Sequence, residues 1–439
     1  MIDLDEVPEH LASTAARPPV PYRALLGALS VVMLALLAGA THPAPQQQPT
    51  VIPARLGDTF RLDGDFMYVI GTGGVDSFDE VRDRVITTYR LPAVRMVSRT
   101  TVPIPGTVVD VDQASDTVIV GYQLNASGSQ ATVAYPAGGG PMRWTRSARF
   151  VAASEADGIA LLSADNGDIA IDLATGQERW RVDRPAAGFL AESGARADGG
   201  YPDWLVAFSD ARVRSWDART GRPIASATVP SNHLDGMIWP VSSFLLINAG
   251  EGGFEGYHLP GLRPLWHTPV DLRQSWMQTD CGSVICTFRQ QRGMSVLDPA
   301  DGHLLWDSDR WVYARPLGPY LLATADDGGR AALSVLDPAT GRVLGDFGAW
   351  QGLGVAGDSG LIWGQRAAPG SYQVFYGLLD PADRSVRVLG RADRVSGGCE
   401  TSAVPPPAPG SPEGATGQRT AGVMVCRLVD ASVAVWQLR

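Results

Sequence analysis

The sequence contains no lysine, so every basic side chain is Arg or His. This absence excludes a Walker A phosphate-binding loop, a kinase-type catalytic lysine and any Schiff-base mechanism, because all three require an ε-amine. A GC-rich bacterial genome, which encodes Arg in place of Lys, would account for the bias. The formal net charge of −10 also leaves no basic surface for phosphate groups, so we expect no nucleic-acid partner.

Catalytic and metal-binding motifs are equally scarce. The six His residues form no H-E-x-x-H pair, and no G-x-S-x-G elbow presents a serine nucleophile. The Gly-rich stretches 71–74 and 137–141 lack a strand–loop–helix context, and the acidic stretches 110–116 and 163–168 do not match a calcium-binding loop. We interpret all four as hairpin turns, and we predict no catalytic residue, no cofactor and no metal.

Charge is absent from residues 24–40, ALLGALSVVMLALLAGA. This run is just long enough to span a bilayer as a helix, and Arg17 and Arg23 lie on its N-terminal side. The alternatives are a signal peptide cleaved after Ala38-Gly39-Ala40 and a buried soluble helix. The positive-inside rule predicts a single-pass protein of the cell membrane, with an acidic cytoplasmic tail over 1–23, a transmembrane signal anchor over 24–41, a Pro- and Gln-rich linker over 42–55 and an extracytoplasmic domain over 56–439.

Gly (50 residues) and Pro (32 residues) are abundant, and they separate short runs of β-branched and aromatic residues such as TVIVGYQ. A phrase recurs after these runs, for example IAIDLATGQERW at 169–180 and LSVLDPATGRVLG at 333–345. Its glycines at 176, 221, 261, 302 and 341 are spaced by 45, 40, 41 and 39 residues. A period near 40 with several strands per unit is typical of a β-propeller, and hence of an all-β fold.

The recurring phrase has a local structural explanation. Its Asp carboxylate can accept hydrogen bonds from backbone N–H groups two residues on, and its Gly can adopt the left-handed conformation that closes a hairpin loop. A Trp on the following strand can fill the wedge between neighbouring sheets. We assign this structural role, and no catalytic one, to Asp172, Gly176, Trp180, Asp217, Gly221, Asp298, Gly302, Trp306, Asp337 and Gly341.

The D-x-x-T-G-x-x-x-W phrase resembles the repeat of the PQQ-type (quinoprotein-like) β-propellers, over most of residues 56–439. Such propellers include dehydrogenases, extracellular kinase sensors and non-enzymatic assembly scaffolds. The enzymes of the family bind the quinone with an adjacent Cys-Cys disulfide, a Trp floor, a calcium ion and an Asp base. This sequence has no adjacent Cys pair, and we can map neither the calcium ligands nor the Asp base onto it. A PQQ-dependent dehydrogenase, or another enzyme working in the propeller funnel, therefore remains the alternative function.

The number of blades depends on how the ring closes. We mark units that begin near residues 56, 107, 149, 188, 236, 276, 311, 353 and 395, the last of them without a fourth strand. A propeller closes when a strand from one terminus completes the blade of the other. If the segment near 51–62 is that strand, the first unit is partial. We therefore favour eight four-stranded antiparallel blades, with seven or nine as alternatives.

The four cysteines predict two disulfides, because even counts in extracytoplasmic domains are typical of disulfide bonding. Cys281 and Cys286 flank a tight hairpin, and Cys399 and Cys426 occupy corresponding places in the last unit. This shared placement favours the pairs 281–286 and 399–426. Free buried thiols and a zinc site are the alternatives, although one C-x4-C pair is a poor match to zinc.

The function that these features favour is that of a non-catalytic binding or scaffolding module for protein or glycan partners. A propeller is a rigid disc with many loops on its two faces, which suits recognition. We expect a protein or cell-envelope partner at rim loops, and the candidate loops are 72–82, 192–203 and the Pro- and Gly-rich insertion 402–421.

Overall fold

In a computed structural model of the chain, contacts divide the protein into two units, residues 1–46 and 47–439. The structure describes residues 26–31, 48–71, 81–124, 128–186, 188–194, 200–209, 211–229, 238–241, 243–250, 253–272, 275–289, 293–326, 331–356, 360–402 and 422–438. In the first unit, residues 26–31 are helical. Among the described residues, none of the helices is both long enough and apolar enough to cross a membrane.

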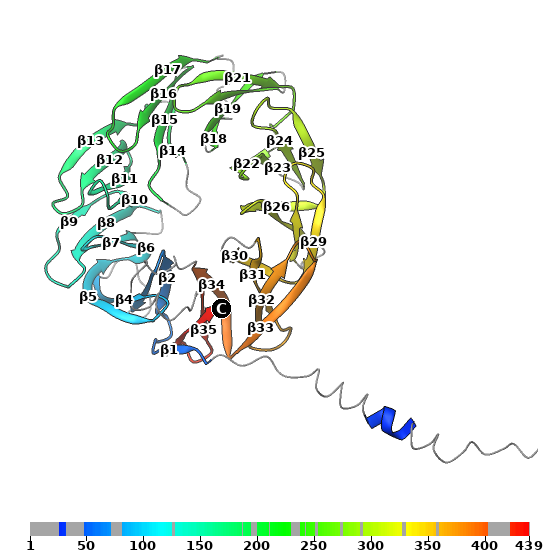
Figure 1. The fold of residues 1–439 in the computed structure, drawn as a ribbon. Coiled ribbons are helices and arrows are strands. Elements are labelled where there is room, and N and C mark those ends of the chain that lie inside the picture. The colour runs from blue at the N-terminus through cyan, green and yellow to red at the C-terminus, as the bar shows by residue number, and fades with distance from the viewer. Residues whose placement is uncertain are drawn as a thin grey trace, which may run out of the picture. The chain divides into compact units, whose positions relative to one another are not determined.

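The described part of residues 47–439 forms nine four-stranded antiparallel sheets, which stand around a ring as the blades of a propeller (Figure 1). Each blade is a meander in which the first strand lies nearest the centre of the ring and the last strand lies at its periphery. The fold is therefore all-β, as the 40-residue period predicts.

The blades are numbered along the chain. Blade 1 contains β2 (Thr59–Asp63), β3 (Phe66–Gly71), β4 (Val81–Arg90) and β5 (Arg95–Pro105); blade 2 contains β6 (Thr107–Ala114), β7 (Thr117–Gln123), β8 (Gln130–Pro136) and β9 (Trp144–Arg146); blade 3 contains β10 (Arg149–Ser154), β11 (Ile159–Ala164), β12 (Gly167–Asp172) and β13 (Glu178–Asp183). Blade 4 contains β14 (Phe189–Ser193), β15 (Trp204–Ser209), β16 (Arg212–Asp217) and β17 (Pro223–Thr228); blade 5 contains β18 (Ile238–Val241), β19 (Phe244–Gly250), β20 (Gly253–His258) and β21 (Arg263–Thr268); blade 6 contains β22 (Ser275–Asp280), β23 (Ile285–Arg289), β24 (Met294–Leu297) and β25 (Leu304–Ser308).

The last three blades complete the ring. Blade 7 contains β26 (Trp311–Leu317), β27 (Tyr320–Asp326), β28 (Ala331–Leu336) and β29 (Val343–Gly348); blade 8 contains β30 (Gln351–Val355), β31 (Ile362–Ala367), β32 (Gln373–Asp380) and β33 (Ser385–Asp393); blade 9 contains β34 (Val395–Ser402), β35 (Gly422–Leu428), β36 (Val433–Leu438) and, from the other end of the propeller, β1 (Thr50–Ile52).

The prediction of eight blades is wrong, and the error lies in the closing strand. The strand that completes blade 9 is β1, in which Thr50 pairs with Val435 and Ile52 with Val433. Residues 59–63, which fall in the segment that we assigned to closure, instead form β2 and pair with β3 as the first strand of a complete blade. All nine units marked in the sequence are therefore full blades, and closure begins inside the stretch that we assigned to the linker.

The core lies between adjacent blades. The middle strands are buried almost throughout, as in β7 and β12, because each sheet is covered on both faces by its neighbours. One cluster, for example, joins Tyr68 and Ile86 of blade 1 to Val111 and Val120 of blade 2. The outermost strands, such as β17, alternate between partly buried and exposed residues because one edge faces solvent.

The recurring phrase forms the turn between the third and fourth strands of a blade. In blade 3 the Asp172 carboxylate accepts hydrogen bonds from the backbone N–H groups of Ala174 (3.1 Å) and Thr175 (2.9 Å). Gly176 then adopts a φ of 68°, in the left-handed region. Blades 4, 6 and 7 repeat this arrangement, with turn carboxylates and left-handed glycines at Asp217, Gly221, Asp298, Gly302, Asp337 and Gly341.

The Trp that follows such a turn reaches the next blade. Trp180 of blade 3 donates a hydrogen bond from Nε1 to the carbonyl oxygen of Arg219 in blade 4, at 2.9 Å. A Cβ added to Gly221 would lie 2.6 Å from the Trp180 ring, so only glycine permits this approach. Trp266 and Trp306 make the same contact with the turns of blades 6 and 7. Trp144, which does not follow a copy of the recurring phrase, makes a similar contact with blade 3, where its Nε1 donates a hydrogen bond to the Leu173 carbonyl.

The interface between blades 4 and 5 is one of those that lack this contact. The last strand of blade 4, β17, carries no Trp, and a Cβ added to Gly261 of blade 5 would meet no atom within 4 Å. The Ser215 hydroxyl instead donates a hydrogen bond to the Pro260 carbonyl across this interface, at 2.6 Å. Adjacent blades can therefore be joined by the Trp contact or by another hydrogen bond such as this one.

Candidate functional site

Charged side chains gather on the first strands of blades 1–4 and 9, which face the centre of the ring (Figure 1). We call this surface the inner wall. Its ionisable residues are Arg61 and Asp63 on β2, Asp110 and Asp112 on β6, Arg149 on β10, Glu192 on β14 and Glu400 on β34. These residues lie far apart in the sequence, and the ring brings them together.

A pair of carboxyl groups joins blades 1 and 2 at the inner wall. The Asp112 carboxyl lies within hydrogen-bonding reach of the Asp63 side chain, and a hydrogen bond between two carboxyl groups needs a proton, because an ionised carboxylate only accepts hydrogen bonds. Burial, followed by the hydrogen bond and the charge of Asp63, raises the pKa of Asp112 well above its ordinary value. Burial likewise raises the pKa of Asp110 on the same strand.

The hydroxyl of Tyr68 on β3 lies in the field of these carboxyl groups. The Tyr68 side chain is fully buried, and its hydroxyl has no hydrogen-bond partner in the part of the chain that the structure describes. Burial and the nearby charges, led by Asp112, raise the Tyr68 pKa, so this hydroxyl stays protonated. The arrangement can hold a proton between blades.

Blades 3 and 4 are joined by an ion pair and a buried acid. Arg149 on β10 pairs with Glu192 on β14 at 3.0 Å. Asp168 on β12 is only 1 % exposed, and burial is the main reason that its pKa rises to about 6. The charge of Glu192 adds to this rise in pKa, whereas Ser163 and the nearby Arg side chains offset part of it.

Replacing Asp168 by Asn should make the propeller more stable at neutral pH. The folded-state pKa lies above the ordinary value of 3.8, so the wild-type carboxyl favours folding below about pH 4 and this contribution is lost as the pH rises to about 6. Because Asn does not ionise, we expect Asp168→Asn to gain about 2 kcal/mol in unfolding free energy at pH 7.5. The difference between variant and wild type should shrink toward zero at pH 4. Urea unfolding at both pH values measures it, and a difference that does not change with pH would contradict the assignment.

One further cluster has the composition of a metal site. Single ligand atoms of Asp298, Asp301 and His303 lie within 4.8 Å of one another in the turn before β25. Each carboxylate is already used by the turn, because Asp298 accepts a hydrogen bond from the N–H of Ala300 (2.7 Å) and Asp301 accepts one from the N–H of His303 (3.1 Å). Both Asp301 and His303 are exposed, so the cluster is explained by the turn.

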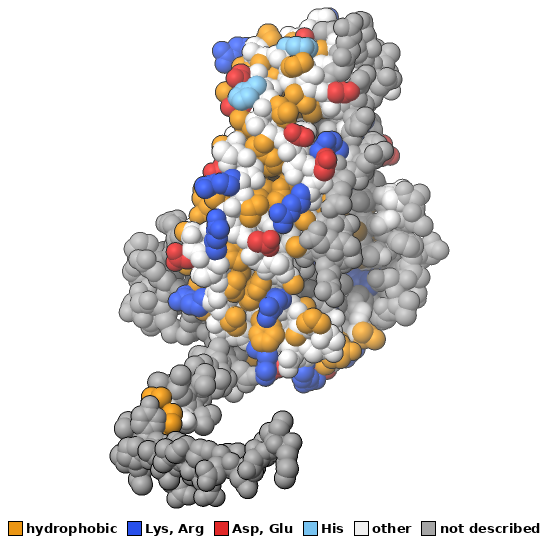
Figure 2. Space-filling view, turned by 90° about the vertical axis from the view of Figure 1, so that its right-hand side faces the viewer, with side chains coloured by type: hydrophobic (Ala, Val, Ile, Leu, Met, Phe, Trp, Pro, Cys, Tyr) orange, Lys and Arg blue, Asp and Glu red, His pale blue; other side chains and the backbone are white. Residues whose placement is uncertain are grey.

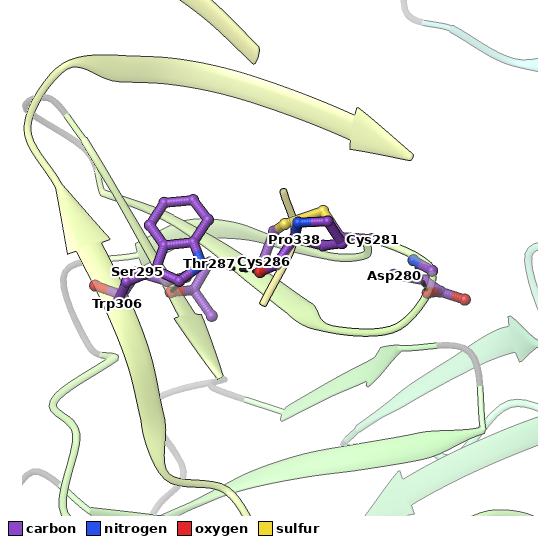
Figure 3. Close-up of a disulfide and its surroundings, with 8 residues drawn as sticks. Asp280, Cys281, Cys286, Thr287, Ser295, Trp306 and Pro338 are labelled. Atoms are coloured by element: carbon purple, nitrogen blue, oxygen red, sulfur yellow. Dashed lines mark hydrogen bonds between the residues drawn. A yellow bond between two sulfur atoms is a disulfide. The ribbon is translucent and has the colours of Figure 1, made fainter. Parts of the chain in front are cut away.

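The cysteines form the disulfides 281–286 and 399–426. In blade 6, Cys281 follows β22 and Cys286 lies on β23, so the bond closes the first hairpin of the blade (Figure 3). In blade 9 the second bond joins β34 to β35, where Cys399 and Cys426 are directly paired residues. Both bonds therefore hold the first two strands of their blades together.

Two of the three candidate rim loops lie largely beyond the described residues, and the third lies partly beyond them. Residues 72–80 and 403–421, which make up most of two of these loops, and residues 195–199 of the third are outside the described ranges. The acidic stretches that we interpreted as turns prove to be mostly strand. Asp110 and Asp112 belong to β6, and Asp168 belongs to β12, because only residues 115–116 and 165–166 make the turns. Because these stretches have the composition of turns, the carboxyl groups of the inner wall could not be recognised as strand residues from the sequence.

Comparisons with known proteins give one partial sequence match. A family model described as outer membrane protein assembly factor BamB matches residues 103–244, from the end of blade 1 into blade 5. This supports a propeller built from repeats of the PQQ type. A search of curated proteins finds no match.

Similar solved structures are propellers of several kinds. BamB from Moraxella catarrhalis is 13 % identical, with 90 % of this chain and 98 % of that chain covered and a TM-score of 0.42. The designed protein Ika8 is 15 % identical, with 76 % and 96 % covered and a TM-score of 0.42. The C-terminal WD40 domain of Sif2 is 8 % identical, with 90 % and 99 % covered and a TM-score of 0.44. At such identities and scores, these structures do not define the function of this chain.

Proposed function

We propose that this protein is a non-catalytic, membrane-anchored β-propeller that binds protein partners outside the cytoplasm. The observation that carries the proposal is the match of residues 103–244 to a family model described as an outer membrane protein assembly factor. An assembly factor acts by contacting other proteins, and a rigid ring of sheets offers it a stable surface for those contacts.

Two further features support the proposed location. The disulfides 281–286 and 399–426 are of the kind that persists in oxidising compartments such as the periplasm. The uncharged run 24–40 has the length and the flanking arginines of a signal anchor whose C-terminal side faces outward. Both features favour the same side of the membrane for the propeller.

The periphery of the ring offers contacts to a partner. Leu304 on β25 and Val386 and Val388 on β33 are between 37 and 44 % exposed. On this flank, hydrophobic side chains alternate with Arg and acidic side chains (Figure 2). Such a mixed surface suits a protein partner better than it suits a lipid bilayer, which would need a continuous apolar band.

A reporter fusion and crosslinking test this proposal. Alkaline phosphatase fused after Arg439 should be active in cells, because the enzyme folds only where its own disulfides can form, and the same fusion without residues 24–41 should lose that activity. Crosslinking in intact membranes should then join the propeller to one or a few defined proteins. An inactive fusion would refute the location, and a propeller that crosslinks to no protein would refute the binding role.

A further inference from the structure

A small cavity lies between blades 7 and 8, close to the inner strands β26 and β30. Its volume is about 170 Å³, and its boundary includes Leu322 and Leu333 of blade 7 and Trp350, which precedes β30. These three side chains are between 2 and 6 % exposed and belong to one hydrophobic cluster. The deeper part of the cavity is therefore apolar.

The size of the cavity restricts what it can hold. An apolar cavity of about 150 Å³ in another protein stays dry and binds benzene, whereas pockets for drug-sized ligands start near about 300 Å³. The cavity between blades 7 and 8 thus has room for one aromatic ring or one branched aliphatic group. It has no room for a dinucleotide or a tricyclic quinone.

One charged side chain, Arg315 on β26, borders the cavity. This Arg is half-buried, and its Nη2 donates a hydrogen bond to the Gly352 carbonyl across the cavity at 2.5 Å, which fixes the guanidinium in place. Arg315 has no ion-pair partner among the described residues, and no Asp or Glu lines the cavity. Four of its five N–H groups are thus left for another acceptor.

A second cation lies near the same wall. The guanidinium carbon of Arg366 on β31 lies 5.5 Å from the centroid of the Trp350 ring. Arg315 is the only charged group among the lining residues, beside the apolar side chains of Leu322, Leu333 and Trp350. A guanidinium in such a place binds a carboxylate more strongly than an uncharged acceptor, because both of its parallel N–H bonds can be used in a shielded site.

From this geometry we propose that the cavity binds a carboxylate carried on one compact apolar group, with the carboxylate on Arg315 and the apolar group against Leu322, Leu333 and Trp350. This inference rests on the proposed function, because it names the chemical group by which a binding partner would be recognised. The same chemistry occurs in the C-terminal residue of a peptide and in a free aromatic or branched-chain acid.

Calorimetric titration of the full-length protein tests the assignment with four probes. N-acetyl-L-phenylalanine and 3-phenylpropionate should bind at least tenfold more tightly than their amides, a ratio that corresponds to about 1.4 kcal/mol. Tighter binding of the acetylated amino acid would identify a peptide terminus as the source, and tighter binding of 3-phenylpropionate would identify a free acid. Acids that bind no better than their amides, or no binding at millimolar concentrations, would overturn the proposal.

Two variants with the same change in charge locate the site. Arg315→Gln removes the charge but keeps a polar side chain, so it should abolish the preference for acid over amide. Arg342→Gln removes an exposed Arg of the same blade outside the cavity, and it should change affinity by less than twofold. Equal loss in both variants would overturn the site.

Thermal unfolding of each variant must match wild type, so that lost binding is not lost folding.

Leu333→Phe provides a second, uncharged route, because a larger side chain in the cavity should abolish binding of both acids. These measurements use purified protein, so their failure would leave the crosslinking and fusion results unaffected.

Discussion

Replacing Gly302 by Ala should destabilise the propeller by about 3 kcal/mol. Two independent effects add: a φ of 72° costs an L-residue about 1 kcal/mol, and the new Cβ would lie 2.3 Å from Cε3 of the Trp266 ring. The indole would have to move out of its place against the turn, which adds about 2 kcal/mol as overpacking does elsewhere. The midpoint of urea unfolding measures the sum.

A matched control separates the two effects. Gly64 also has a positive φ, of 52°, but a Cβ there would meet no atom within 4 Å, so Gly64→Ala should cost about 1 kcal/mol only. In a Trp266→Ala background the cost of Gly302→Ala should fall to a similar value, because the clash is gone. If Gly302→Ala destabilised the protein equally with and without Trp266, contact with the indole would not be the reason that glycine is required at this position.

Removing the Cys399–Cys426 disulfide should also destabilise the propeller strongly. We expect the free energy of unfolding to fall by about 3.5 kcal/mol, because in the chain-entropy model the bond restricts the unfolded chain. The two cysteines are 27 residues apart in sequence, so the bond restricts a long loop of the unfolded chain. The double variant Cys399→Ala with Cys426→Ala, unfolded in urea under oxidising conditions, measures the effect.

The other disulfide provides the control for this comparison. Cys281 and Cys286 are only 5 residues apart, so their loss should cost about 2 kcal/mol by the same account. All four cysteines are at most 8 % exposed, and hence the packing lost on truncation to Ala is similar in both pairs. Equal destabilisation in the two double variants would show that loop length does not set the contribution.

The repeat and its turns could be predicted because their causes are local. The Asp carboxylate and the left-handed Gly of each turn act within four residues, as Asp172 and Gly176 do, so the pattern is visible in any window of the sequence. The disulfide pairs were also accessible, because each joins the first two strands of one repeating unit. A structural role for Trp on the following strand was predicted from its place four or five residues after the turn glycine.

The closing strand and the inner wall could not be predicted for the opposite reason. The choice between eight and nine blades depends on whether β1 or β2 pairs with β36, and a strand of three residues such as Thr50–Ile52 carries no signal of its partner. Asp63 and Asp112 meet only because neighbouring blades put their first strands side by side. The stretch around Asp112 has the composition of a turn, but it forms a strand because its backbone pairs with β7.

The all-β repeat, the turn chemistry and the disulfide pairs follow from the order of residues alone, since hydrogen bonds between near neighbours and a fixed period specify them. The number of blades, the neighbouring carboxyls Asp63 and Asp112 and the cavity beside Arg315 become visible only in the folded chain, because they depend on contacts between blades. Such contacts depend on how the ring closes. Closure is driven by the burial of apolar faces between blades, and all blades have such faces. The apolar pattern of the sequence therefore does not indicate which strand completes the last blade.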